Sequence, residues 1–215
     1  MTRVKICGIK SAEDAQAVAA FGADELGFHV KLNGGRSPLE ADVAKALVGA
    51  LPKSSAGVVV TSLTDAKELI EIAQATGAST LQLYGDATPE TIREFKKALP
   101  EVKIWKVLNV SDENSIEKAK EYEDAADAIA LDTLNKATGV RGGTGKTHDW
   151  SISKRIVESI SIPVILAGGL NPDNIAEAIR TVRPYGVDVN SGVSNPDGSK
   201  DLEKVKLFIE RARNL

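Results

Sequence analysis

Short β-branched segments alternate regularly with longer amphipathic segments, and this pattern constrains the fold more than any other feature of the chain. Eight apolar runs are typical of buried strands, and they cover residues 3–7, 25–30, 56–61, 80–83, 103–108, 128–131, 163–166 and 187–189. Eight segments with helical periodicity lie between and after them, at residues 12–20, 39–51, 64–76, 88–99, 111–122, 150–160, 172–181 and 202–212. Strands and helices that alternate in this way indicate parallel βαβ units.

Both a closed (β/α)8 barrel and an open doubly wound sheet satisfy this pattern. The first strand is not followed by Gly-x-Gly-x-x-Gly, which marks the dinucleotide-binding doubly wound folds, and this favours the barrel. No linker, low-complexity tract or shift in composition divides the 215 residues. We therefore predict an α/β protein that forms one (β/α)8 TIM-barrel domain over residues 1–215.

Capping residues and glycines support these boundaries. Ser11 and Thr88 provide side-chain oxygens ahead of two predicted helices, and Pro89 stands in a first turn, where its missing N–H is harmless. Gly77 and Gly186 follow helical stretches and precede strands, where a left-handed residue commonly ends a helix.

Charge and composition narrow the choice of partners. The net charge of -3, from 27 basic and 30 acidic residues, gives no strong field for nucleic acid or an anionic membrane. One cysteine allows no internal disulfide, and no apolar run resembles a signal peptide or reaches membrane-spanning length, so we expect a cytoplasmic protein. Two histidines, His29 and His148, leave little room for a multi-histidine metal centre.

The barrel prediction places two reactive side chains at one mouth, because active sites of such barrels lie where the strands end at their carboxyl side. Cys7 closes the first predicted strand and Asp132 follows the sixth. A partly ionised thiol removes protons, and a buried carboxyl group donates them. The pair predicts acid–base chemistry; the alternatives are a buried apolar cysteine and a turn-forming aspartate.

Glycines after the last two strands predict a phosphate site. Gly168 and Gly169 follow the seventh strand, and Asn190, Ser191 and Gly192 follow the eighth. Glycine lets the backbone approach an oxyanion, and barrels often bind phosphate in these two loops. Ordinary turns also use glycine, so the combination of both loops carries the prediction.

Two further loops lie on the predicted rim. Arg36, after the second strand, has the planar fork that clamps a carboxylate, although a solvated loop arginine is the alternative. The longest connection, residues 133–149, contains Gly143 and has the length of a binding loop. Its Gly-Lys-Thr at 145–147 resembles the end of a nucleotide-binding P-loop, but Gly139 lies six residues before Gly145 instead of five.

A buried ion pair is expected where the barrel closes. Alternation puts Lys5 on the inward face with Cys7, and Asp188 on one face with Asn190. The first and eighth strands are neighbours in a closed barrel, and a buried lysine is costly unless it is paired. We predict that Lys5 contacts Asp188 within the roughly 4 Å of an ion pair.

Several segments, in order and over nearly the whole chain, resemble the motifs of the phosphoribosylanthranilate isomerase family. They are residues 4–9, 22–24 with 26–28, 81–85, 131–133, 142–150, 168–172 and 187–193. The Cys-Gly-Ile start and the Gly-Thr-Gly-Lys-Thr-x-Asp-Trp loop are the most specific of them.

The resemblance implies an isomerase of tryptophan biosynthesis that performs an Amadori rearrangement of N-(5-phosphoribosyl)anthranilate without cofactor or metal. It implies that Asp132 protonates the ribose ring oxygen and that Cys7 removes the C2′ proton. Arg36 is then expected to bind the anthranilate carboxylate. The expected partner is a small phosphosugar, and the expected state is a monomer or homodimer.

The same resemblance assigns the remaining contacts with the substrate. The residues expected to bind it, mainly through its phosphate, are Gly143, Gly168, Gly169, Asn190, Ser191 and Gly192.

Three segments depart from the family pattern. Residues 29–36 replace an aromatic-proline stretch, Tyr84 stands where a histidine is usual, and Asn190 replaces a serine.

Two alternatives to this function stay open. One is another barrel enzyme, such as a phosphopentose epimerase or the α subunit of tryptophan synthase. The other is a non-catalytic or altered-substrate phosphosugar-binding barrel, which the retention of both Cys7 and Asp132 disfavours.

Overall fold

The strands form a closed parallel barrel in a computed structural model that describes residues 1–33, 38–133 and 147–215. The strands are β1 (Arg3–Cys7), β2 (Glu25–His29), β3 (Ala56–Thr61), β4 (Thr80–Leu83), β5 (Lys103–Asn109), β6 (Ala128–Asp132), β7 (Val164–Leu166) and β8 (Gly186–Val189). Their order around the barrel is their order along the chain, and β8 pairs with β1. The predicted (β/α)8 architecture is confirmed.

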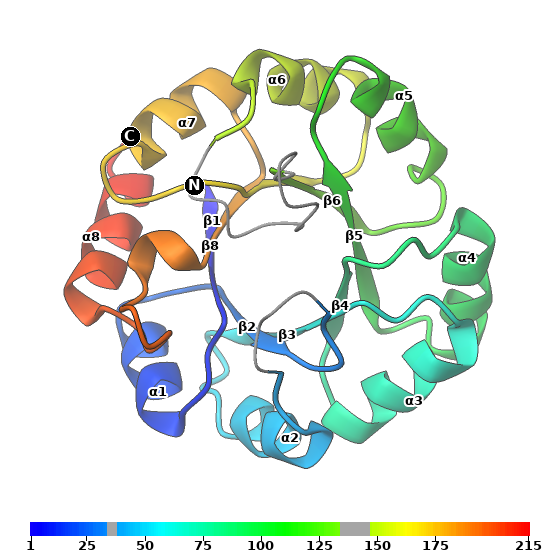
Figure 1. Ribbon diagram of the computed structural model, residues 1–215, viewed down its shortest axis with the longest axis horizontal. Coiled ribbons are helices and arrows are strands. Elements are labelled where there is room, and N and C mark those ends of the chain that lie inside the picture. The colour runs from blue at the N-terminus through cyan, green and yellow to red at the C-terminus, as the bar shows by residue number, and fades with distance from the viewer. Residues whose placement is uncertain (34–37, 134–146) are drawn as a thin grey trace.

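Helices surround the strands as an outer ring (Figure 1). They are α1 (Ala12–Ala20), α2 (Ala41–Gly49), α3 (Ala66–Thr76), α4 (Pro89–Ala98), α5 (Asn114–Glu121), α6 (Trp150–Ser159), α7 (Ile175–Val182) and α8 (Leu202–Arg213), with a short 3-10 helix η1 (Ser191–Val193) after β8. Among the helices of the described residues, none combines the length and the apolar character that crossing a membrane requires.

Most of the residues predicted to begin or end helices do so in the structure. The Ser11 side chain accepts a hydrogen bond from the Asp14 N–H, and Pro89 opens α4 behind the Thr88 cap. Gly77 ends α3 in the left-handed conformation at φ 66°. The prediction for Gly186 was wrong, because α7 ends earlier and Arg183 takes the left-handed position at φ 55°.

The two faces of the barrel strands enter different clusters. Outward-facing residues such as Val4 and Ile6 are fully buried against α1, α7 and α8. Inward-facing residues form a separate cluster inside the barrel, which comprises Cys7, Leu32, Val58, Val60, Tyr84, Trp105, Val107, Ala128, Ala130 and Ile165. Cys7 and Tyr84 belong to this inner cluster, so the packed barrel interior supports the mouth directly.

A buried ion pair lies across the seam between β1 and β8. Lys5 and Asp188 are register partners, and Lys5 Nζ lies 2.8 Å from Asp188 Oδ2 with both side chains at most 5% exposed. Gln82 Nε2 donates a second hydrogen bond to the same oxygen at 3.3 Å. Burial lowers the pKa of Lys5, but the charges of Asp188 and Cys7 raise it, and the pKa ends above its ordinary value. The predicted contact is confirmed.

Removing one partner of this pair will strongly destabilise the barrel. We expect Asp188→Asn to lower the free energy of unfolding by about 3–5 kcal/mol, because it takes the paired carboxylate away from the buried Lys5 ammonium. Equilibrium urea unfolding measures this change. Glu117→Gln, which breaks the exposed pair with Lys120, serves as the control and should change stability by less than about 1 kcal/mol. Equal effects of the two variants would contradict the role assigned to the buried pair.

Candidate active site

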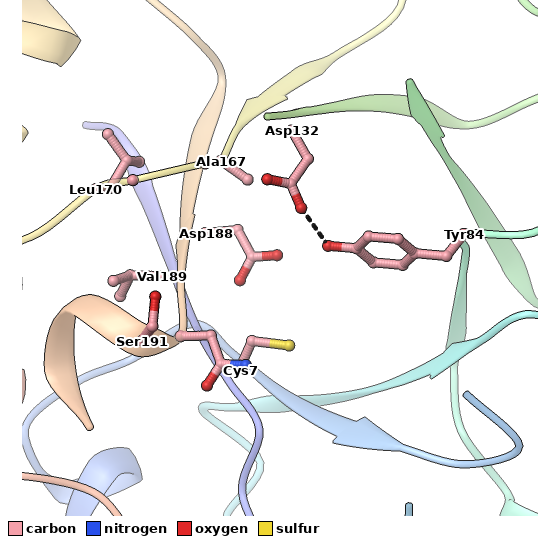
Figure 2. A pocket seen from close by; sticks show the side chains of 11 residues that line it. Cys7, Tyr84, Asp132, Ala167, Leu170, Asp188, Val189 and Ser191 are labelled. Atoms are coloured by element: carbon pink, nitrogen blue, oxygen red, sulfur yellow. Dashed lines mark hydrogen bonds between the residues drawn. The ribbon is translucent and has the colours of Figure 1, made fainter. Parts of the chain in front are cut away.

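One pocket at the carboxyl ends of the strands contains both predicted reactive side chains. It is lined by Cys7, Tyr84, Asp132, Ala167, Gly168, Gly169, Leu170, Asp188, Val189, Asn190 and Ser191. Figure 2 shows the Cys7 thiol and the Asp132 carboxyl group directed into the same space, with Asp188 between them. Segments that are far apart in the sequence therefore converge here, as the barrel geometry predicts.

The Cys7 thiol lies among basic groups. Cys7 is the last residue of β1 and is 4% exposed, and its Sγ lies 3.4 Å from Nε2 of His29 on β2. Its register partner is Gly27, where a Cβ atom would stand only 2.7 Å from Cys7 Sγ and 2.9 Å from Lys5 Nζ. The absence of a side chain at Gly27 thus lets the thiol and both basic side chains approach one another, and nearby cations favour a thiolate.

Two hydrogen bonds fix the Asp132 carboxyl group. Its Oδ1 accepts from the Thr133 N–H at 2.7 Å, and its Oδ2 accepts from the Tyr84 O–H at 2.6 Å. Tyr84 follows β4 and reaches Asp132 across the pocket (Figure 2). Asp132 is only 3% exposed, so both oxygens are held in a defined orientation and a negative charge on them is stabilised by two donors.

The glycine pair after β7 lies directly against this acid. Gly168 and Gly169 have φ of 83° and 68°, which L side chains rarely adopt. A Cβ atom on Gly168 would collide with Thr133 Oγ1 and stand 3.0 Å from Asp132 Oδ1. Neither glycine N–H donates a hydrogen bond to a backbone oxygen of the described residues (1–33, 38–133 and 147–215). Two backbone donors therefore lie beside the carboxyl group on the wall of the pocket.

The loop after β8 completes the opposite wall. Asn190 and Ser191 line the pocket, but Gly192 does not. A Cβ atom on Gly192 would collide with the Leu170 carbonyl oxygen, so this glycine brings the β8 loop against the β7 loop. The structure thus places four of these five predicted phosphate residues at the pocket and gives Gly192 a packing position behind it.

Lys200 is a buried cation that supports the β8 loop. Its Nζ donates to Asn190 Oδ1 at 3.0 Å and to Ser194 Oγ at 2.8 Å, and the residue is 4% exposed. Burial lowers the pKa of Lys200 to about 8, although the negative charges of Cys7 and Asp14 oppose the shift. The Asn190 amide oxygen is therefore already engaged with a lysine at the edge of the site.

Two predicted site residues, Arg36 and Gly143, lie outside the described residues. In the part of the chain that the structure describes, no group of three or more His, Cys, Asp or Glu side chains is arranged to hold a metal ion.

Sequence reasoning missed the partners of the two reactive groups. It did not pair His29 with Cys7 or Tyr84 with Asp132, although strand alternation carried a signal for the first pair. Gly27 and His29 are alternate residues of β2, so both face inward beside Cys7. Lys200 belongs to no periodic segment, and no comparable signal pointed to it.

His148 contacts Thr133, the residue that follows Asp132. Its Nδ1 lies 3.1 Å from Thr133 Oγ1 and its Nε2 lies 2.6 Å from Ser153 Oγ on α6. Burial lowers the pKa of His148 to about 4, although Asp149 opposes the shift. The imidazole is therefore neutral at pH 7, and it links Thr133, the neighbour of the acid, to α6.

This buried neutral histidine predicts a specific acid sensitivity. The pKa of His148 is about 4 in the folded chain, against 6.5 for the ordinary side chain, so between these values the unfolded chain binds more protons. The contribution of neutral His148 to the free energy of unfolding is therefore complete above pH 6.5 and is lost as the pH falls toward 4. We expect His148→Gln to flatten the fall in unfolding free energy over this window, measured by urea unfolding at a series of pH values. Identical slopes in the variant and the wild type would refute the assignment.

Comparisons with known proteins agree on one family. The model of the family described as N-(5′-phosphoribosyl)anthranilate (PRA) isomerase matches residues 4–211. The N-(5′-phosphoribosyl)anthranilate isomerase 2 of Methanosarcina mazei is 43% identical over 213 residues, which are 99% of this chain and 94% of that protein. A structure of monomers of the dimeric phosphoribosylanthranilate isomerase from Thermotoga maritima has a TM-score of 0.85 at 33% identity, with full coverage of both chains. Another phosphoribosylanthranilate isomerase structure, in complex with reduced 1-(o-carboxyphenylamino)-1-deoxyribulose 5-phosphate, has a TM-score of 0.85 at 32% identity, also with full coverage of both chains.

Proposed function

The chain belongs to the N-(5′-phosphoribosyl)anthranilate isomerase family, and from this membership we propose that it catalyses the Amadori rearrangement of N-(5-phosphoribosyl)anthranilate. The product is 1-(2-carboxyphenylamino)-1-deoxyribulose 5-phosphate. The observation that carries the proposal is the single pocket lined by a thiol, a carboxyl group and a glycine-rich backbone wall. The reaction requires an acid, a base and an anchor for the phosphate, and this pocket supplies all three.

Asp132 is the general acid of this proposal. It donates a proton to the ribose ring oxygen, the C1–O bond breaks, and the ring opens to a Schiff base. Each carboxyl oxygen keeps a lone pair that can carry the proton while it accepts a hydrogen bond. The carboxylate left behind is stabilised by the Thr133 N–H and the Tyr84 O–H. Tyr84 therefore serves the acid in the place where the family usually has a histidine.

Cys7 is the general base. Its thiolate removes the C2′ proton from the Schiff base, which gives an enolamine that tautomerises to the ketose. The adjacent Lys5 is paired with Asp188, so it stabilises negative charge near the thiol without itself titrating near neutral pH. In both steps the protein exchanges only protons with the substrate, and the chain's own side chains supply the donor and the acceptor.

The loops after β7 and β8 hold the phosphate in this proposal. The N–H groups of Gly168 and Gly169, together with Ser191, surround a space beside Asp132 in which an oxyanion accepts backbone hydrogen bonds. With the phosphate anchored there, the ribose extends from the β7–β8 side of the pocket toward Cys7 and Asp132.

Other parts of the proposal rest on the sequence alone. The binding of the anthranilate carboxylate by Arg36 and the contact of Gly143 with the substrate stay predictions. The cytoplasmic location and the monomeric or homodimeric state stay predictions as well.

Replacing either reactive group should abolish most of the turnover. We expect Cys7→Ser and Asp132→Asn each to lower kcat by about a hundredfold or more, because each removes one proton-transfer group. Consumption of the fluorescent substrate measures the rate, and circular dichroism checks that the variants fold. A wild-type protein that binds phosphosugar tightly but turns nothing over would instead support the non-catalytic binding barrel.

The glycine wall gives a second prediction. We expect Gly168→Ala to raise KM at least about tenfold, because the left-handed backbone and the contact with Thr133 force the loop away from the phosphate. Inorganic phosphate should correspondingly become a weaker inhibitor. Gly49→Ala is the matched control, since Gly49 ends α2 and a Cβ atom there meets nothing within 4 Å. Unchanged KM and phosphate inhibition in Gly168→Ala would locate the phosphate elsewhere.

A further inference from the structure

The contact between His29 and Cys7 has no part in the function proposed so far. His29 Nε2 lies 3.4 Å from Cys7 Sγ, within hydrogen-bonding range for sulfur, and both residues are 4% exposed. The contact joins adjacent strands of the barrel wall, so rigid backbone fixes it from both sides. A thiol beside an imidazole is the arrangement by which enzymes convert a weakly ionised cysteine into a thiolate.

We propose that His29 is a positioning residue that holds Cys7 as a thiolate, the form in which it acts as a base. This inference rests on the proposed function, in which Cys7 removes the C2′ proton. His29 itself exchanges no proton with the sugar; it acts only through the sulfur atom.

The proton balance follows from this pairing. The S–H bond of Cys7 breaks and an N–H bond forms at Nε2 of His29, which gives a thiolate beside an imidazolium. The thiolate then takes the C2′ proton, and the C–H electron pair becomes part of the enolamine. When the enolamine tautomerises, C1 gains a proton from the Cys7 thiol and the C2 hydroxyl proton passes to the Asp132 carboxylate. Both groups thereby regain their starting protonation states, and the imidazolium stays protonated throughout.

Two basic side chains act on the thiol directly, Lys5 through its charge and a hydrogen bond and His29 at 3.4 Å. Of these two, the imidazole has the lone pair that can accept the thiol proton, because the pKa of Lys5 lies above its ordinary value and an ammonium group only donates. From β1 and β8, Lys5 and Asp188 are paired with each other at 2.8 Å. Across a second cavity, which His29 lines, lie Lys10 and Asp197, and Lys10 attracts the Asp197 carboxylate.

Lys200 is a further cation that acts on the thiol, and its ammonium group is engaged by Asn190 and Ser194. It interacts with Cys7 through its charge, whereas His29 lies within hydrogen-bonding distance of the sulfur atom.

The position of His29 between two cavities gives the pair a route to solvent. Cys7 lines the pocket that contains Asp132, while His29 lines the neighbouring cavity together with Gly8, Asn190 and Ser191. The imidazole can therefore reach protonation equilibrium through the second cavity while substrate fills the first.

The chain offers a clean test, because Cys7 is its single cysteine and every thiol signal reports on it. The test titrates the ultraviolet absorbance of the thiolate, and the rate of alkylation by iodoacetamide, against pH without substrate. We expect the wild-type thiolate to form well below the roughly 8.5 of a free thiol. His29→Gln should move the midpoint of the thiol titration upward by at least about one pH unit. His29→Asn is a second variant, for the case that the glutamine side chain disturbs folding, and it should move the midpoint in the same direction.

Turnover gives the second readout. At neutral pH the two His29 variants should lose at least about tenfold in kcat with a smaller change in KM, and the loss should shrink as the pH rises toward 9 and the thiol ionises unaided. A merely structural histidine would lower the rate equally at every pH. His148→Gln removes the other histidine and should leave the thiol titration where it is.

An unchanged thiol midpoint in both His29 variants would overturn the inference, whatever happens to turnover. Failure of the proposed function gives a different result. In that case the wild-type protein turns over no substrate, or Cys7→Ser stays as active as the wild type, while the thiol midpoint still depends on His29.

Discussion

The buried pair of Lys5 and Asp188 is the interaction on which the rest of this structure depends. It joins the first and last strands of the barrel at 2.8 Å, in an interior where neither charge is tolerable alone. Because the two residues are register partners, the pair fixes how β1 and β8 align at the seam. Two residues further along the chain, Cys7 at the end of β1 and Asn190 just after β8 then reach the mouth at one level. The electrostatic requirement of the interior thus also sets the geometry of the site.

Room at the mouth comes from residues without side chains as much as from residues with them. Gly27 leaves space beside Cys7, and Gly168 lets the β7 loop approach Asp132 and Thr133 more closely than any Cβ atom allows. Gly192 does the same between the β7 and β8 loops. These close approaches bring backbone N–H groups, a thiol and a carboxyl group around one space, which a bulkier rim would have filled.

Cys7 and Asp132 each have a polar partner from another strand or from the end of one. Tyr84 follows β4 and holds Asp132 on β6, while His29 on β2 lies against Cys7 on β1. These partners fix the orientation of the group that they contact, because residues on strands or at strand ends are held more rigidly than residues of a flexible loop. Tyr84 is also one of the departures from the family pattern, and its hydroxyl group gives Asp132 a polar partner at that position.

The sequence by itself determined the barrel, its strand ends to within one residue, the pair at the seam and the convergence of Cys7 and Asp132. All of these follow from alternation along strands and from the cost of burying a charge, which are local or nearest-neighbour properties. Only the tertiary structure decided that Arg183 rather than Gly186 ends α7, that Lys200 engages Asn190, and that Tyr84 and His29 contact Asp132 and Cys7. These outcomes depend on distances between side chains from separate segments, and periodicity fixes the face on which a residue lies but not the atom that it reaches.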